Sequence, residues 1–137
     1  MTMKYHGWIE LNYTEGWRKF EGKEVIYSEY IQSIRLITIK LEELVEKEIF
    51  DIPKSDVSIL VSIDDMTTVH LSGKRNHWRS GPIKLLQWIQ QNAPGSHGQI
   101  HIHDDEHGTL DEVYKIYRLT NNAIVESIET ELKPLID

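Results

Sequence analysis

The sequence predicts an α+β domain in which two helices cover one face of an antiparallel sheet. Several short segments alternate apolar and polar residues, which is the pattern of a strand with one buried face. Two longer segments repeat apolar residues every three or four positions, which is the pattern of an amphipathic helix. The chain has 137 residues, of which 39% are hydrophobic, so we expect a single domain over residues 1–137 with one core.

The first strand is expected over residues 5–12, where Ile9 and Leu11 share one side. After a polar loop, a long helix is expected over about residues 28–50, and Pro53 marks its exit. The apolar residues of this helix fall on one stripe, which would face the sheet. They are Ile31, Ile34, Ile37, Leu41, Leu44, Val45 and Ile49.

A hairpin and a second helix are expected next. The hairpin strands are predicted over residues 57–63 and 68–72, joined by a polar turn at 64–67. The second helix is predicted over residues 82–92, because Pro82 suits a first helical position and apolar residues recur behind it.

The rest of the chain is expected to form a strand over residues 99–103 and a final hairpin over 113–119 and 123–128. Asn121 and Asn122 tolerate the left-handed backbone of a tight hairpin turn. The first six elements follow the order β-α-β-β-α-β of a ferredoxin-like core. The C-terminal β-hairpin is therefore expected as an addition to that core.

The sheet face turned away from the helices is expected to gather histidines and a tryptophan. Because side chains alternate along a strand, inward Ile100 and Ile102 turn His101 and His103 outward. The same argument turns Trp8 outward, and a large exposed aromatic beside charge is typical of an interface anchor unless the final hairpin folds over it. The outward residues are His6, Trp8, Glu10, His70, His101 and His103, and the nearby loops carry Asp64, Asp65, Asp104, Asp105 and Glu106.

The balance of charged residues indicates which class of partner the protein could bind. Fifteen Lys and Arg stand against 22 Asp and Glu, a formal charge of -7, which repels phosphate backbones and favours a basic protein partner. We expect no nucleic-acid partner, and no membrane partner because no stretch approaches about 18 consecutive apolar residues. The chain has no cysteine, and residues 1–8 lack the pattern of a signal peptide, which together favour the cytoplasm.

The segment from His101 to His107 invites a metal interpretation, because two histidines two residues apart on a strand share a face. It resembles the H-x-H-x-D-H signature of metallo-β-lactamase-type hydrolases, but Glu106 separates Asp105 from His107, so the match fails by one residue. Polar residues that alternate on a solvated sheet face explain the same pattern without metal. A small metal-dependent hydrolase using His101, His103 and Asp105 stays the alternative.

Residues 74–79 form a short basic and aromatic segment that could contact phosphate in isolation. Because the whole chain is acidic, we expect this segment to form internal ion pairs or to contact a protein partner. Its basic and aromatic residues are Lys74, Arg75, His77, Trp78 and Arg79.

Three motifs and the tail of the chain are informative together. The motifs are Tyr5-His6-Gly7-Trp8-Ile9, Ser72-Gly73-Lys74-Arg75-Asn76-His77, and Ala93-Pro94-Gly95-Ser96-His97-Gly98 followed by Ile102-His103-Asp104-Asp105. With residues 114–119 and 132–137, they resemble the Immunity protein 7 family of bacterial polymorphic toxin systems over nearly the whole length. The resemblance implies a cytoplasmic binding protein, not an enzyme, that inactivates a cognate toxin domain.

The main hypothesis is a stoichiometric inhibitor without cofactor or metal that binds a toxin domain, for which a basic nuclease is one candidate. Acidic residues 104–106 would mimic phosphate charge, with Trp8 or His103 nearer the centre. We expect a monomer or small homo-oligomer, and a self-associating structural domain is a further alternative. The expected toxin-binding residues are Trp8, Asp64, Asp65, Arg75, His77, His103, Asp104, Asp105 and Glu106.

Overall fold

The computed structural model describes residues 2–12, 24–62, 66–104 and 114–129, with the backbone alone for residues 24–30 and 129. Its strands are β1 (Met3–Glu10), β2 (Val57–Val61), β3 (Thr67–Arg75), β4 (His97–Asp104), β5 (Tyr114–Thr120) and β6 (Ala123–Glu129). Its helices are α1 (Glu24–Glu46), the short 3-10 helix η2 (Lys54–Asp56) and α2 (Gly81–Asn92).

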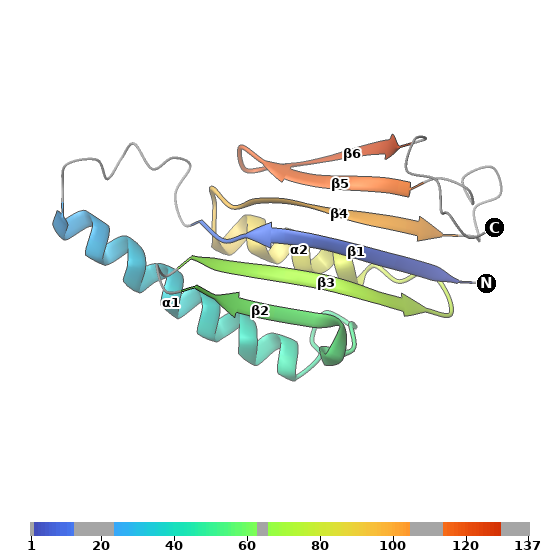
Figure 1. Cartoon of the computed structure of the whole chain (residues 1–137), viewed down its shortest axis with the longest axis horizontal. Helices are drawn as coiled ribbons and strands as arrows, with labels where there is room; N and C mark the ends of the chain where they lie inside the picture. The colour runs from blue at the N-terminus through green and yellow to red at the C-terminus, as the bar shows by residue number, and fades with distance from the viewer. Residues whose placement is uncertain (1, 13–23, 63–65, 105–113, 130–137) are drawn as a thin grey trace.

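Within the described ranges, the six strands form one sheet in the order β2-β3-β1-β4-β5-β6, and every neighbouring pair is antiparallel. β1 lies in the interior of the sheet between β3 and β4, and β3 is inserted between β1 and β2. The hairpin β5–β6 extends the sheet beyond β4. Both helices lie on the same face of the sheet (Figure 1). The predicted α+β class with two helices on one antiparallel sheet is therefore confirmed.

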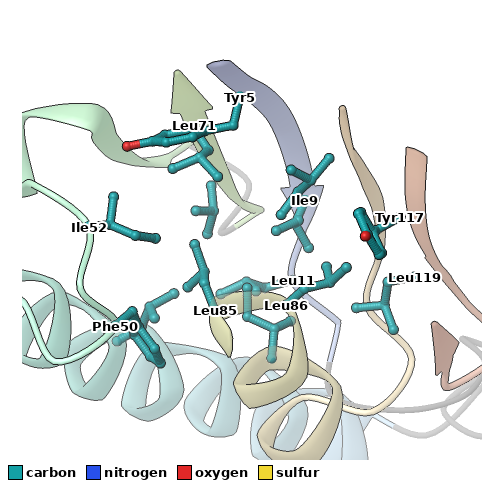
Figure 2. Close-up of a cluster of buried hydrophobic side chains, with 14 of the residues drawn as sticks. Tyr5, Ile9, Leu11, Phe50, Ile52, Leu71, Leu85, Leu86, Tyr117 and Leu119 are labelled. Carbon is teal, nitrogen blue, oxygen red and sulfur yellow. The ribbon is translucent and has the colours of Figure 1, made fainter. Parts of the chain in front are cut away.

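The core lies between the sheet and the helices. Figure 2 shows Tyr5 and Ile9 of β1 on the sheet side of the cluster and Leu85 and Leu86 of α2 on its helix side. Ile9, Leu85 and Leu86 are fully buried, and burial of each such side chain contributes about 1.5–3 kcal/mol. The other buried apolar residues of this core are Met3, Leu11, Ile34, Leu41, Phe50, Ile52, Val69, Leu71, Ile89, Ala93, Ile100, Ile102, Tyr117 and Leu119.

The long helix ends earlier than its apolar stripe predicts. α1 stops at Glu46, and Glu48 takes a left-handed backbone with φ 53°, while the amide of Ile49 donates to the carbonyl of Leu44 at 3.1 Å. The predicted inward position of Ile49 is wrong, because this turn leaves its side chain 61% exposed. Phe50, at 7% exposure, is the residue that enters the core.

The final hairpin turns where the sequence predicts. Asn121 and Asn122 both have positive φ angles, 49° and 58°, as a two-residue turn between right-twisted strands requires. The hairpin pairs with β4 and stays in the plane of the sheet, so it does not fold over Trp8.

Candidate functional site

The sheet face opposite the helices, which we call the open face, carries side chains in rows set by the strand register. In the first row, Lys4 of β1 lies between Lys74 of β3 and His103 of β4. In the second row, His6 lies opposite His101. Because directly opposite residues share a face, each row brings together residues that are far apart in the sequence.

The next rows of the open face contain Trp8 between His70 and Gln99, and Glu10 opposite His97. The outward positions predicted for the histidines of β1, β3 and β4 agree with this register. His97 was missed because β4 begins two residues before the predicted strand. The histidines of the open face are His6, His70, His97, His101 and His103.

Trp8 is a large exposed aromatic residue near the middle of the open face, with 40% of its surface accessible. Its ring meets the ring of His97 edge-on at a centroid distance of 5.9 Å. Nε2 of His97 lies 3.1 Å from a carboxylate oxygen of Glu10. The predicted outward position of Trp8 is confirmed, and its neighbours hold the ring on one side.

His6, His101 and Tyr114 form an aromatic cluster on the same face. The two imidazoles stack at 4.9 Å with an interplanar angle of 12°, and Tyr114 meets His6 edge-on at 5.3 Å. Burial lowers the pKa of His6 below its usual value, because it disfavours the charged ring. His101 is only 8% exposed, so it behaves as a packed aromatic residue although it points away from the helices.

The hypothesis of a metal site finds no ligand set among the described residues. No group of three or more His, Asp or Glu within them is arranged to hold a metal ion. His101 and His103 share the open face, but each also contacts an aromatic ring, at 4.9 Å from His6 and 5.6 Å from Tyr114. Asp105, the third residue of that hypothesis, lies outside the described residues.

The prediction that Asp104 belongs to an exposed acidic loop is wrong. β4 continues to Asp104, which lies opposite Met3 on the helix-covered face and is 7% exposed. A buried carboxylate of this kind is not available to mimic phosphate on the surface. Asp64, Asp65, Asp105 and Glu106 lie outside the described residues.

The described neighbours of the two predicted acidic groups lie at opposite ends of β1. The described neighbours of residues 64 and 65 are joined by a hydrogen bond from Ser62 to Met66, and Thr67 next to them accepts one from Leu11. Asp104 instead lies at the Met3 end of β1. β1 has eight residues, so these ends are roughly 23 Å apart at about 3.3 Å per residue.

Arg75 is tied to the segment that follows α1. Its Nη1 donates to the carbonyl of Asp51 at 2.9 Å, and its Nη2 lies 3.8 Å from the Asp51 carboxylate. Arg79 approaches the same carboxylate at 3.1 Å, so the predicted internal ion pairs of this basic segment are present. His77 is exposed and lines a shallow hollow with Asp51, Trp78, Arg79 and Ser80.

Several motif residues have structural roles. The hydroxyl of Tyr5 donates to Asp56 Oδ2 at 2.6 Å, and a Cβ at Gly73 would lie 2.0 Å from the same oxygen. A Cβ at Gly98 would lie 2.2 Å from the carbonyl oxygen of Trp8, so β1 and β4 approach too closely for a side chain there. Glycine at these positions therefore serves packing.

Ser96 closes the other end of β1. Its Oγ accepts a hydrogen bond from the Asn12 amide at 2.8 Å and donates to the Ala93 carbonyl at 2.7 Å. The Ala-Pro-Gly-Ser-His-Gly motif therefore joins the end of α2 to the end of the central strand. Ser96 therefore has a structural role in this motif.

A groove between α1 and β2 is the other surface feature that could bind a partner. Its charged residues are mostly paired with one another, with Glu43 near Lys47 at 3.3 Å and Glu46 near Lys54 at 2.8 Å. Ile39, which is 62% exposed, is its largest exposed apolar side chain. The groove is lined by Ile39, Glu42, Glu43, Val45, Glu46, Lys54, Ser55, Val57 and Ile59.

The comparisons with known proteins place the chain in a family. The family model described as Immunity protein 7 matches residues 2–137. No curated protein and no solved structure matches the chain significantly. No helix among the described residues is long and apolar enough to cross a membrane. Since the family match covers all but the first residue, the chain belongs to the Immunity protein 7 family, which is a family of immunity proteins against toxins.

Proposed function

We propose that this protein binds a cognate bacterial toxin domain through the open face and thereby neutralises it, with one copy per toxin molecule in the cytoplasm. Family membership and one structural observation support it. Trp8 is exposed near the middle of the sheet face opposite the two helices that the structure describes. No catalytic step, cofactor or metal is part of this mechanism.

Trp8 has the properties of a binding anchor. Tryptophan is enriched among the few interface residues that carry most of the binding energy. β1 has a paired strand on each side, and the His97 ring contacts the Trp8 indole at 5.9 Å. A side chain that is already held loses little conformational freedom when a partner covers it. The open face can therefore bind without rearranging its central strand.

The partner is a toxin domain with a basic surface, for which a nuclease is one candidate. The formal charge of -7 accelerates encounter with such a protein through long-range attraction. Asp64, Asp65, Asp105 and Glu106 stay candidates for this attraction, and His103 and His77 are candidates for direct contact. Asp104 is no longer a candidate for toxin contact because it is buried. Arg75 contributes to toxin binding only indirectly, because its side chain is held by Asp51.

The proposal is tested with the cognate toxin domain, which is to be sought in the reading frames next to the one that encodes this chain. Trp8→Ala is expected to weaken binding about 30-fold, since loss of such an anchor costs about 2 kcal/mol. Ile39→Ala, which changes an exposed apolar residue of the groove, is the matched control and is expected to bind normally. Calorimetric titration gives affinity and stoichiometry, and growth rescue gives protection.

Thermal melting shows whether each variant keeps its fold. If Ile39→Ala loses the toxin while folded Trp8→Ala binds as tightly as the unmodified chain, the docking surface is the groove and the proposal is wrong. If the unmodified chain gives no binding and no protection, the proposed function itself fails.

A further inference from the structure

The geometry points to an acidic patch on the toxin as the surface that receives the Lys4 end of the open face. For a toxin whose catalytic cleft binds phosphate, this places docking beside the cleft. This inference rests on the proposed function and adds the chemistry of the contact. It replaces phosphate mimicry as the mode of inhibition.

Lys4 and Lys74 form the pair that carries the inference. They lie directly opposite each other on β1 and β3, and both side chains are exposed. Within the described part of the chain, no carboxylate lies within ion-pairing distance of either ammonium group. The lysines near the groove differ, since Lys47 and Lys54 each have a glutamate partner.

Two like charges directly opposite each other on a sheet repel and destabilise the pairing. His103 of β4 lies on the other side of Lys4 in the same row. A carboxylate from a partner would convert this repulsion into attraction. Among the residues that the structure describes, no carboxylate offsets this repulsion, so an acidic partner surface would stabilise the bound state.

The open face is also polarised along β1. Glu10, paired with His97, is its acidic residue among the side chains that the structure describes, and it lies at the far end of the strand from Lys4. Glu10 is six positions along the strand from Lys4, or roughly 20 Å at about 3.3 Å per residue. Trp8 lies between them. Opposite charges on the two sides of an anchor allow one orientation of the partner and disfavour the reverse.

The cationic end determines where on the toxin this face can bind. A cleft that binds phosphate groups is lined by Lys and Arg, and it would repel Lys4 and Lys74. An inhibitor that docks with these lysines therefore contacts a surface next to the cleft. The net charge of -7 still attracts the toxin from a distance, because long-range attraction depends on the whole charge distribution.

The test reverses the charge of the pair. The double variant Lys4→Glu with Lys74→Glu is compared with Lys40→Glu with Lys84→Glu, which makes the same change in net charge on the helices. Association with the toxin domain is measured at salt concentrations from about 50 to about 300 mM, where screening increases. The open-face variant is expected to bind about 10-fold more slowly than the control at low salt.

Two results would overturn the inference. The first is faster association of the open-face variant than of the control, which would mean that these positions face a basic surface. The second is equal association of the two variants. In either case the loss of binding in Trp8→Ala shows whether the open face is still the docking surface, so failure of this inference is separable from failure of the proposed function. Melting curves establish that both double variants are folded.

Discussion

The hydroxyl of Tyr5 donates a 2.6 Å hydrogen bond to Asp56 Oδ2, which ties β1 in the interior of the sheet to the end of η2, next to the edge strand β2. The Tyr5 ring is 2% exposed, and its burial, with the neighbouring carboxylate, raises the pKa of the hydroxyl above its usual value. Gly73 of β3 leaves the space that the pair occupies. Three segments far apart in the sequence are thereby coupled.

Tyr5→Phe removes this hydrogen bond while keeping the ring. We expect the free energy of unfolding at about pH 7 to fall by about 1–2 kcal/mol, because Asp56 loses a donor in a partly buried site. Urea denaturation measures the change. Tyr117→Phe is the control, since Tyr117 is also buried but no hydrogen bond of its hydroxyl is found among the described residues. Equal losses in both variants would contradict the role given to Asp56.

Stability is expected to fall at alkaline pH. The unfolded chain releases the Tyr5 proton near pH 10, while the folded chain keeps it because its pKa is raised. The contribution of Tyr5 to the free energy of unfolding is therefore complete below about pH 10 and is lost as the pH rises further. Tyr5→Phe should show a smaller fall in the urea midpoint between about pH 8 and about pH 11. Some fall remains, because burial also raises the pKa of Tyr117.

His6 is expected to make the protein less stable in acid. Its pKa is lowered by burial, so the unfolded chain takes up a proton below about pH 6.5 before the folded chain does. The contribution of neutral His6 to the free energy of unfolding is present above that pH and is lost as the pH falls. His6→Phe keeps a ring against His101 and should lose less stability between about pH 7.5 and about pH 5.5. His70→Phe, an exposed change on the same face, should behave like the unmodified chain.

Substitutions at two neighbouring residues after α1, Ile49 and Phe50, are expected to lower the free energy of unfolding by different amounts. Phe50→Ala should lower the free energy of unfolding by about 3 kcal/mol, because it empties part of the core. Ile49→Ala should change it by about 0.5 kcal/mol or less, because that side chain is 61% exposed. Denaturant titration of both variants is the measurement. Similar costs would mean that Ile49 is packed after all.

Most strands and the inner face could be predicted from alternation alone. Ile9, Ile100 and Ile102 are buried as expected, and their neighbours point to the open face. The errors arise at element ends. β4 runs from residue 97 to residue 104, and the same alternation applied to the longer strand turns His97 outward and Asp104 inward. The periodicity was correct, but single-sequence patterns do not fix where a strand stops.

Other features depend on contacts that no local pattern encodes. The Ile49 position fits the helical stripe, yet the left-handed residue Glu48 ends the helix before it. Arg75 is held by Asp51, which is 24 residues away, and that contact follows from the way β3 lies next to the turn after α1. The stacking of His6 on His101 requires the β1–β4 register. The geometry of the site therefore depends on pairing between segments that are far apart in the sequence.

The interior place of β1 has a consequence during synthesis. β1 is translated before both of its partner strands, which are complete only at residues 75 and 104. Long-range pairing of this kind delays folding until distant segments are available. The surface around Trp8 therefore forms only after β4 has been synthesised, so a nascent or truncated chain that ends before β4 lacks the proposed binding surface.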